Sequence, residues 1–264
     1  MSAKIFIPID STALSLGANE VAEAISKEAI TRKIDIQIVR NSSRGLFWLE
    51  TLVEVETPKG RIGFGPVNVK DVKSLFEADF IKGGSHSLAL GLVKDIDWLK
   101  KQERLTFARM GINEPTNIDQ YIEHDGFQGL KNALNLKSEA IVATVTDSGL
   151  RGRGGAAFPT GIKWKTVLDT KASQKYIVCN ADEGDSGTYS DRMIMEGDPY
   201  VLIEGMIIAG LAVGASQGYI YLRSEYPHAL KTLNEAIQIA TKAGYLGNDI
   251  LKSGKIFHLE DRKS

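Results

Sequence analysis

The sequence predicts a mixed α/β fold made of two parts with a helical segment between them. Apolar, β-branched runs alternate with amphipathic helical patterns in residues 1–82 and again in residues 137–264. In the second part this alternation favours a mostly parallel sheet, because helical crossovers connect parallel strands. The length of 264 residues and the hydrophobic share of 43% allow one large or two smaller hydrophobic cores.

Composition and charge exclude several classes of protein. The net charge of −1 gives no indication of a nucleic-acid or membrane-surface partner. No apolar run approaches the ~20 residues of a transmembrane helix, and the N-terminus lacks the features of a signal peptide. Cys179 is the single cysteine, so neither an internal disulfide nor an all-cysteine iron–sulfur site can form within this chain. The expected compartment is a reducing cytoplasm, with membranes reached only through partners.

The first part, residues 1–82, has the element order of a small thioredoxin-like domain. Its pattern is strand, helix, strand, hairpin and helix, and other small α/β folds share that pattern. The hairpin turn is predicted at the polar stretch 57–60. The predicted elements are Lys4–Asp10, Gly17–Lys33, Asp35–Arg40, Leu46–Val67 and Asp71–Phe80.

Residues 83–136 are predicted to form a helical linker. A polar, glycine-containing stretch at Lys82–Ser87 marks the boundary. An amphipathic helix is expected over Asp95–Gly111, because a glycine stops it and a proline follows.

The second part, residues 137–264, alternates helix and strand. Ser138–Gly149 is ambiguous, because valine and threonine favour a strand whereas the flanking serine and glycine favour a helix. An almost wholly apolar helix over Tyr200–Gly214 is predicted to be buried. Strands are expected at Tyr176–Cys179, Gly218–Ser224 and Lys255–Glu260.

A glycine-rich stretch, LRGRGGAAFPTGIKW at residues 150–164, predicts a phosphate-binding loop. Glycine permits a positive φ and lets a ligand approach backbone N–H groups without meeting a Cβ. Such N–H groups beside basic side chains suit phosphate. The residues concerned are Gly152, Gly154, Gly155 and Gly161, with Arg153 and Lys163 among and after them.

A carboxylate cluster follows the strand YIVC, in the stretch CNADEGDSGTYSDR at residues 179–192. Asp182, Glu183 and Asp185 come directly after the strand end, which is where ligands bind in α/β sheets. Carboxylates there can accept hydrogen bonds from ribose or ribityl hydroxyls. Together the two stretches indicate a nucleotide site. A glycine-rich surface loop with a solvated acidic turn, or an ordinary Rossmann site using Gly152, Gly154 and Ala157, remain the alternatives.

These two stretches resemble the signature segments of the NADH-oxidising flavoprotein family. That family includes the flavoprotein subunit of respiratory complex I and the diaphorase subunits of NAD-reducing hydrogenases and NAD-dependent formate dehydrogenases. The resemblance extends over roughly residues 100–260 and favours a helix for Ser138–Gly149. It implies that residues 137–264 form a partial Rossmann-like domain that binds FMN and NAD(H). In such a domain hydride passes between NAD(H) and FMN, and single electrons pass to iron–sulfur partners.

The resemblance also assigns cofactor contacts and no catalytic or metal-binding residue. The loop that FMN and the dinucleotide approach corresponds to Gly152, Arg153, Gly154 and Gly155. Contacts to FMN correspond to Lys163, Asn180 and Asp182. The aromatic stacked on the adenine of NADH corresponds to Phe158, and an acidic position near the dinucleotide corresponds to Asp185. Glu183 is assigned by its neighbourhood alone. In two departures from the family pattern, Ala157 replaces a common glycine and Thr166 a second stacking phenylalanine.

The first part departs further from the family. Many members have a thioredoxin-like ferredoxin here, whose two-iron cluster is held by cysteines that this chain lacks. The domain therefore resembles a degenerate ferredoxin. The absence of these cysteines and the segments VRNSSRGLFWLE and GPVNVKDV together give the first part its strongest resemblance, which is to the beta subunits of soluble NAD-dependent formate dehydrogenases. It implies two partners, an iron–sulfur subunit with a thioredoxin-like fold and a molybdenum-type catalytic subunit.

Family members continue beyond the region that this sequence covers. They add a glycine-rich segment beside the flavin, a ubiquitin-like domain and a cysteine-rich domain with a four-iron four-sulfur cluster. The resemblance therefore implies the N-terminal portion of such a subunit, inactive by itself, with that cluster expected only in the missing part. Two other classes stay open, a non-catalytic assembly subunit and an ordinary Rossmann NAD-binding dehydrogenase.

Overall fold

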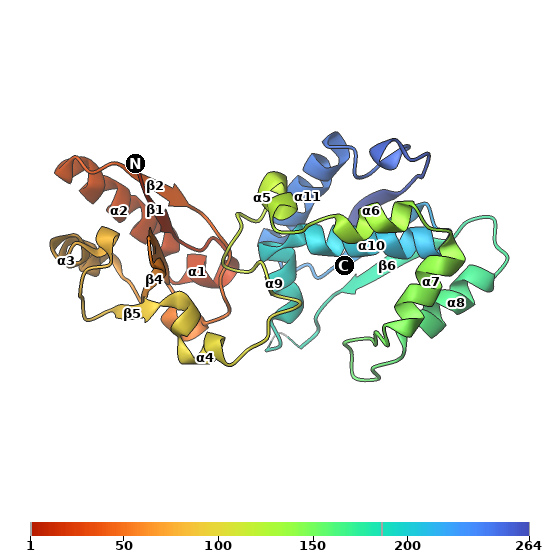
Figure 1. Ribbon diagram of the computed structural model, residues 1–264, viewed down its shortest axis with the longest axis horizontal. Helices are drawn as coiled ribbons and strands as arrows, with labels where there is room; N and C mark the ends of the chain where they lie inside the picture. The colour runs from red at the N-terminus through yellow and green to blue at the C-terminus, as the bar shows by residue number, and fades with distance from the viewer. Residues whose placement is uncertain (1, 186, 264) are drawn as a thin grey trace. The chain divides into compact units, whose positions relative to one another are not determined.

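The computed structural model describes residues 2–185 and 187–263 and shows a mixed α/β protein, as the sequence predicts (Figure 1). Its contacts divide the chain into two compact units. Unit 1 comprises Met1–Pro115 and Glu196–Asp198, and unit 2 comprises Thr116–Met195 and Pro199–Ser264. The predicted three-part division at positions 82 and 136 stays a prediction.

Unit 1 is built on a five-stranded sheet with the order β2-β1-β3-β4-β5. The first two strands are parallel, and each following neighbour is antiparallel. The hairpin turn lies where it was predicted, because Thr57 pairs with Gly60. The strands are β1 (Ala3–Phe6), β2 (Ile36–Val39), β3 (Val53–Thr57), β4 (Gly60–Phe64) and β5 (Ala89–Leu92).

The helices of unit 1 pack apolar side chains onto this sheet. In α2 (Ala18–Arg32) the buried residues recur with helical spacing, and they join the strand residues in one core. That core includes Ile5, Val55, Phe64 and Phe80, each fully buried. The other helices are α1 (Ser11–Ser15), α3 (Val72–Glu77) and α4 (Asp97–Lys100).

The long helix predicted over Asp95–Gly111 is wrong, because α4 ends at Lys100. Beyond α4 the chain is irregular, and its end is fixed at Gly111. The carbonyl of Gly111 accepts hydrogen bonds from the side chains of Asn41 (2.8 Å), Arg44 (3.2 Å) and Arg61 (2.6 Å). These long-range bonds hold the end of the irregular stretch in place, and sequence spacing cannot reveal them.

Unit 2 contains a three-stranded parallel sheet with the order β6-β7-β8, which confirms the predicted parallel arrangement. The ambiguous stretch at 138–149 is helix α7. The last strand lies three residues further along than predicted, because Phe257 instead pairs with Gly247 in an antiparallel bridge. The strands are β6 (Tyr176–Ala181), β7 (Gln217–Leu222) and β8 (His258–Lys263).

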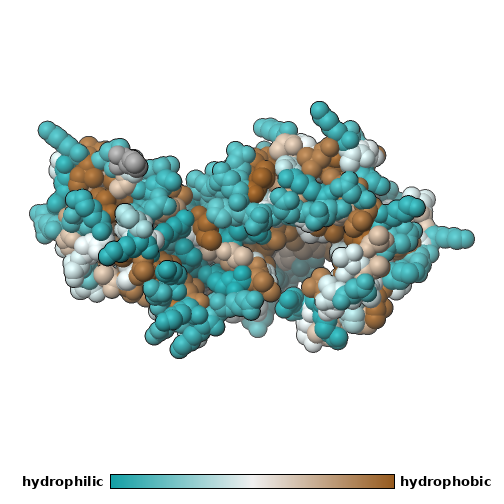
Figure 2. All heavy atoms as spheres, viewed as in Figure 1, coloured by the Kyte–Doolittle hydropathy of each residue, from teal (hydrophilic) through white to brown (hydrophobic). Residues whose placement is uncertain are grey.

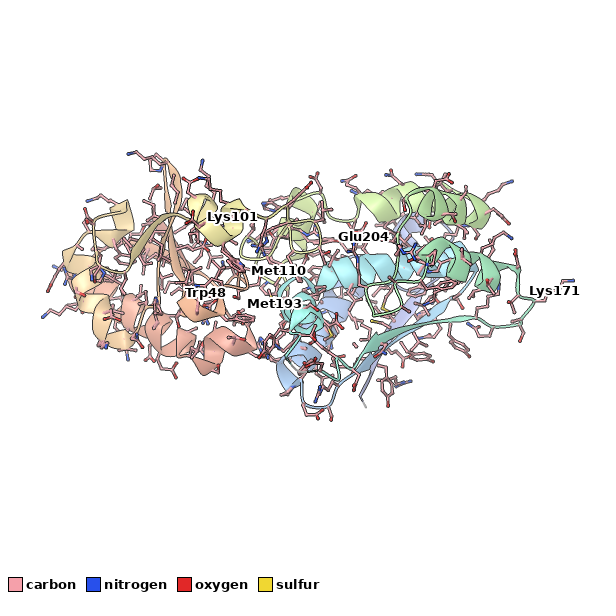
Figure 3. The ribbon with its side chains drawn as sticks, turned by 90° about the horizontal axis from the view of Figure 1, so that it is seen from below. Trp48, Lys101, Met110, Lys171, Met193 and Glu204 are labelled. Carbon is pink, nitrogen blue, oxygen red and sulfur yellow. The ribbon has the colours of Figure 1, made fainter. Side chains whose placement is uncertain are left out.

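The core of unit 2 forms around the apolar helix α10 (Pro199–Val213). Glu204 is a buried acidic side chain on this helix (Figure 3). It accepts hydrogen bonds from the Tyr121 hydroxyl (2.6 Å) and from the backbone N–H groups of Phe127 (2.8 Å) and Leu130 (2.9 Å). Those N–H groups begin helix α6, so Glu204 caps that helix from inside the core.

The other helices of unit 2 precede and connect the strands. Figure 2 shows mainly hydrophilic residues on the visible face of each unit, with apolar residues interspersed. Within residues 2–185 and 187–263, no helix is long and apolar enough to cross a membrane. The helices are α5 (Ile118–Glu123), α6 (Gln128–Leu134), α7 (Ser138–Asp147), α8 (Thr160–Asp169), α9 (Ser190–Gly197) and α11 (Pro227–Lys242).

Candidate functional site

The glycine-rich loop connects α7 to α8 and is closed at its base by its own hydrogen bonds. The N–H of Gly152 donates to the carbonyl of Phe158 (2.9 Å), and the N–H of Thr160 donates to the carbonyl of Leu150 (2.9 Å). The Arg151 side chain donates to the carbonyl of Ala157 (2.7 Å). The loop therefore has a defined shape although almost all of it is exposed.

The glycines at the tip of this loop provide open space. A Cβ added to Gly154 or Gly155 would meet no atom within 4 Å. Neither of them has a positive φ, whereas Ala157 does, with φ 45°. The expected left-handed conformation therefore falls on the alanine that replaces a common glycine of the family, and the tip glycines leave the backbone accessible.

A pocket of about 280 Å³ lies on one side of the loop. It brings together five predicted residues, namely Gly152, Gly154, Gly155, Phe158 and Lys163. The Phe158 ring is 49% exposed, so it is open to stacking instead of being committed to the core. A second pocket, of about 550 Å³, includes Gly152 and Arg153.

Arg153 in the loop and Lys163 on α8 have no acidic partners among the described residues. In the described part of the chain, neither Arg153 nor Lys163 forms an ion pair. Both are exposed beside open backbone. Unpaired cations next to accessible N–H groups attract a phosphate or another anion.

Gly161 has a different role from the other glycines. A Cβ at this position would overlap Thr146 on α7. The missing side chain therefore allows α7 and α8 to pack closely, and Gly161 is explained without a ligand.

The acidic segment lies at the carboxyl end of β6, as predicted. The carboxylate of Glu183 accepts from the N–H groups of Asp191 (2.9 Å) and Arg192 (3.2 Å) and from the Tyr226 hydroxyl (2.9 Å). It thus caps α9, and its predicted contact with a cofactor stays a prediction. Burial and the hydrogen bond to Glu183 raise the pKa of Tyr226 to about 12, so this hydroxyl stays a donor at neutral pH.

The other predicted polar residues of this segment are more available. The Asn180 side chain accepts from the N–H of Asp182 (3.2 Å), and Asp185 accepts from the N–H of Gly187 (3.0 Å). The carboxylate of Asp182 accepts no hydrogen bond from any described residue and is half-buried. It is therefore the acidic group best placed to accept from hydroxyls of a ligand.

The glycine loop and the acidic segment are separate clusters in this structure. The 280 Å³ pocket includes none of Asn180, Asp182, Glu183 or Asp185. Over residues 2–185 and 187–263, no hydrogen bond or ion pair joins the two clusters. A ligand that contacts both would have to bridge them.

Two further residues at the carboxyl edge of the sheet were missed from the sequence. Arg223 follows β7 and donates to the carbonyl of Glu183 (2.8 Å), and Tyr226 contacts the carboxylate of the same residue. The signal was available, because residues that follow neighbouring parallel strands meet at one edge of the sheet. Cys179, on β6, is not activated, since burial and then Asp191 raise its pKa to about 11.

The alternative of an ordinary Rossmann site is disfavoured by the position of the loop. The dinucleotide fingerprint requires a strand before the glycines and a helix after them. Here α7 precedes the loop and α8 follows it. The glycines therefore belong to a helix–loop–helix arrangement.

Comparison with known proteins identifies this region. Residues 145–262 match the family described as the Nuo51 FMN-binding domain. The HndC subunit of the NADP-reducing hydrogenase of Solidesulfovibrio fructosivorans is 49% identical over 161 residues, which are 61% of this chain and 33% of that subunit. A NADH-quinone oxidoreductase subunit of Aquifex aeolicus is 50% identical over 144 residues, 54% of this chain and 33% of that subunit. The predicted resemblance to NADH-oxidising flavoproteins is confirmed, and the chain spans about a third of the length of these relatives.

Solved structures give weaker similarities. A NAD⁺-reducing [NiFe]-hydrogenase in its H₂-reduced state aligns with 99% of this chain and 43% of that chain, at 22% identity and a TM-score of 0.48. A thioredoxin-like [2Fe-2S] ferredoxin from Aquifex aeolicus aligns with 34% of this chain and 97% of that chain, at 18% identity and a TM-score of 0.30. Both TM-scores are too low to support an argument, and the thioredoxin-like assignment of residues 1–82 stays a prediction.

Proposed function

We propose that unit 2 carries part of the FMN and NADH site of a diaphorase subunit in an NAD-dependent oxidoreductase. The observation that carries this proposal is the match of residues 145–262 to the Nuo51 FMN-binding domain. The open glycine loop with two unpaired cations lies within the matched region and supports it.

The residues present fit FMN and a dinucleotide. The phosphates would be held by Arg153, Lys163 and the accessible backbone of Gly154 and Gly155. The exposed Phe158 ring offers a stacking surface for the adenine. Asn180, Asp182 and Asp185 would accept from ribityl or ribose hydroxyls at the strand edge, and Glu183 would contact the same ligands while capping α9.

The chemistry itself would belong to the cofactors, since FMN held here would supply hydride acceptance from NADH and single-electron release. The chain supplies position and charge. Arg153 and Lys163 fix the anionic ends of the ligands, and the cap on α9 holds the loop that carries Asp182. Rigid placement of this kind is the usual contribution of a protein to hydride transfer.

We propose formate as the electron source, with the iron–sulfur and molybdenum-type subunits as partners. This finer assignment is supported by the cysteine-free sequence of residues 1–82 and by its two resembling segments. The two relatives are named for NADH-quinone oxidoreductase and NADP-reducing hydrogenase activities, so the competing assignments are hydrogen as the electron source or a quinone as the electron acceptor.

A titration with FMN tests the proposal on the 264-residue chain. Binding is followed by the change in flavin fluorescence. We expect saturable binding that Arg153→Ala weakens by about tenfold or more, because a charged hydrogen bond contributes ~1.5–3 kcal/mol. We expect a similar loss for Asp182→Ala.

The matched control is Lys171→Ala. Lys171 is an exposed basic residue in the loop between α8 and β6 (Figure 3) and lies outside both pockets of the glycine loop. Its substitution should leave the affinity unchanged. An absence of FMN binding, or equal losses for Arg153→Ala and Lys171→Ala, would overturn the proposal.

A further inference from the structure

A second basic pocket lies in unit 1, and its lining includes none of the residues assigned to FMN or NADH. Its volume is about 430 Å³, and its lining among the described residues includes four cationic side chains, Arg44, Arg61, Lys94 and Arg104. No acidic residue is among these lining residues. The pocket is lined by the segment after β2, by β4 and the end of β5, and by the chain from Val93 to Ile112, which includes α4.

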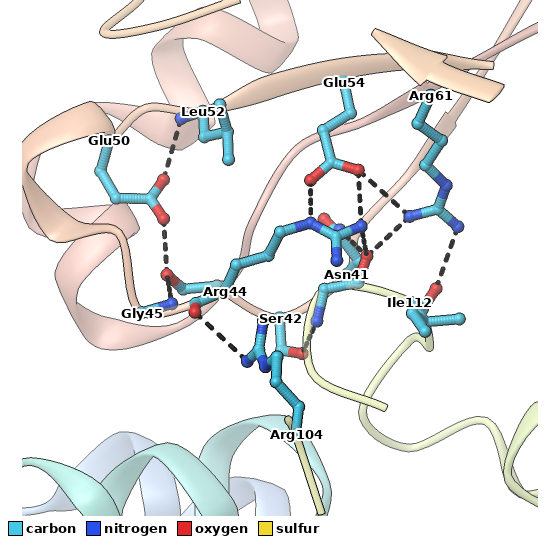
Figure 4. A network of polar contacts seen from close by, with 12 residues as sticks. Asn41, Ser42, Arg44, Gly45, Glu50, Leu52, Glu54, Arg61, Arg104 and Ile112 are labelled. Atoms are coloured by element: carbon cyan, nitrogen blue, oxygen red, sulfur yellow. Dashed lines mark hydrogen bonds and ion pairs between the residues drawn. The ribbon is translucent and has the colours of Figure 1, made fainter. Parts of the chain in front are cut away.

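Two of the four cations, Arg44 and Arg61, share one buried carboxylate. Glu54 is 2% exposed and accepts from Arg44 through both oxygens, with an Nη2–Oε2 distance of 2.9 Å (Figure 4). It also accepts from Nη1 of Arg61 at 3.3 Å. One negative charge therefore faces two guanidinium groups, which leaves this cluster with a net positive charge.

The other two cations have no acidic partner. The guanidinium of Arg104 donates to the carbonyl of Arg44 (3.3 Å), and no described carboxylate lies within ion-pair distance of it (Figure 4). Burial lowers the pKa of Arg104, and the positive charge of Arg44 lowers it further. Lys94 is exposed at the pocket and is also unpaired in the described chain. Half-buried, uncompensated positive charge of this kind is unfavourable unless an anion offsets it.

The remainder of the pocket is apolar. Leu92, Val93, Leu99 and Ile112 contribute to its lining, and Val93 and Leu99 are buried. A bare inorganic ion would leave these surfaces in contact with water. An anion with an apolar body would cover them and gain from their burial.

We propose that this pocket binds a small organic anion, with its phosphate or carboxylate group at Arg104 and Lys94 and its apolar part against Leu92 and Ile112. Glu54 holds Arg44 and Arg61 in position, and these two arginines add to the positive potential of the pocket. The site is independent of the glycine loop, so it does not depend on the function proposed for unit 2.

The test uses the 264-residue chain and four probes. Phenyl phosphate and benzoate carry an anionic group and a ring, inorganic phosphate lacks the ring, and benzyl alcohol lacks the charge. We expect saturable binding of phenyl phosphate, benzoate or both, and at least about tenfold weaker binding of the two incomplete probes. The stronger of the two anions identifies the head group. Amide chemical shifts should change at Leu92 and Ile112, which distinguishes this pocket from the glycine loop.

Substitutions then assign the charge. Arg104→Gln should weaken binding about tenfold, and Arg104→Lys should retain most of the affinity. Lys101→Gln is the matched control, because this exposed lysine follows α4 and is not a lining residue. The proposal is wrong if none of the anions binds saturably, if the shifts map to Gly154 instead, or if Arg104→Gln and Lys101→Gln have the same effect.

Discussion

Arg44 and Arg61 in unit 1 serve a purpose opposite to that of Arg153 in unit 2. In unit 1, Arg44 and Arg61 are mostly buried and share the carboxylate of Glu54 and the carbonyl of Gly111. In unit 2, Arg153 is exposed and has no ion-pair partner among the described residues. The first arrangement holds the chain together, and the second leaves a charge available for a ligand. The degree of internal satisfaction therefore separates structural cations from binding cations in this protein.

Removal of the Glu54 carboxylate, which Arg44 and Arg61 share, is the change with the largest expected effect. We expect Glu54→Gln to lower the free energy of unfolding of unit 1 by about 3–5 kcal/mol, because two buried guanidinium groups lose their counter-charge. The measurement is urea denaturation followed by tryptophan fluorescence in a Trp164→Phe background, where Trp48 and Trp98 of unit 1 report. Glu56→Gln, on the same strand but about half exposed, should change stability by less than about 0.5 kcal/mol. Equal effects would contradict the structural role of the network.

A second buried acid near this network gives unit 1 a pH dependence. Burial first, and then the charge of Asp10, raise the pKa of Glu50 from 4.5 to about 7. In the folded chain the Glu50 carboxyl is hydrogen-bonded to the Ser43 hydroxyl (2.6 Å) and accepts from the N–H of Leu52 (2.9 Å). Between pH 4.5 and about 7 the folded state holds a proton that the unfolded state has lost. Stability from this group is therefore complete below pH 4.5 and is lost as the pH rises toward 7.

The same denaturation series, repeated at several pH values, measures this dependence. We expect the free energy of unfolding of unit 1 to fall by about 1–3 kcal/mol across that interval. Glu50→Gln cannot titrate and should flatten the profile, whereas the exposed Glu56→Gln should preserve it. If the free energy of unfolding rises with pH in both the parent chain and Glu50→Gln, groups other than Glu50 determine the pH dependence of stability.

Local patterns in the sequence were sufficient for most of the fold. The amphipathic pattern of Gly17–Lys33 predicted α2, and the turn residues at 57–60 predicted the β3–β4 hairpin. The helix predicted over 95–111 ends at Lys100, and the chain beyond it is fixed at Gly111 by Asn41, Arg44 and Arg61, which are distant in sequence. Local propensity carries no information about such bonds.

The residues of the candidate site also fall into two groups, those that local sequence predicts and those that only the fold brings together. The glycine loop was predictable because its residues are adjacent in the chain, and five of them line one pocket. Arg223 is not adjacent to the acidic segment in the chain, and its link to Glu183 could be predicted only by pairing β6 with β7. The cation pocket of unit 1 was also beyond reach, since Arg44, Arg61 and Arg104 converge only in the folded chain.

The smallest effect on stability is expected for a substitution of Ala157. This substitution tests whether the glycine-rich loop has a fixed backbone shape. With φ 45° this alanine has a backbone conformation that glycine adopts more readily. Ala157→Gly should therefore stabilise unit 2 by about 0.5–1 kcal/mol. Ala156→Gly, whose backbone φ is not positive, should instead destabilise it by a few tenths of a kcal/mol, as the added chain entropy of the unfolded state would dictate. Fluorescence of Trp164, which lines the loop pocket, reports this unit when Trp48 and Trp98 are replaced by phenylalanine. Stabilisation of unit 2 by both glycine variants would show that φ at position 157 is not strained. Changes of opposite sign in the free energy of unfolding would show that Ala157 fixes the shape of the loop.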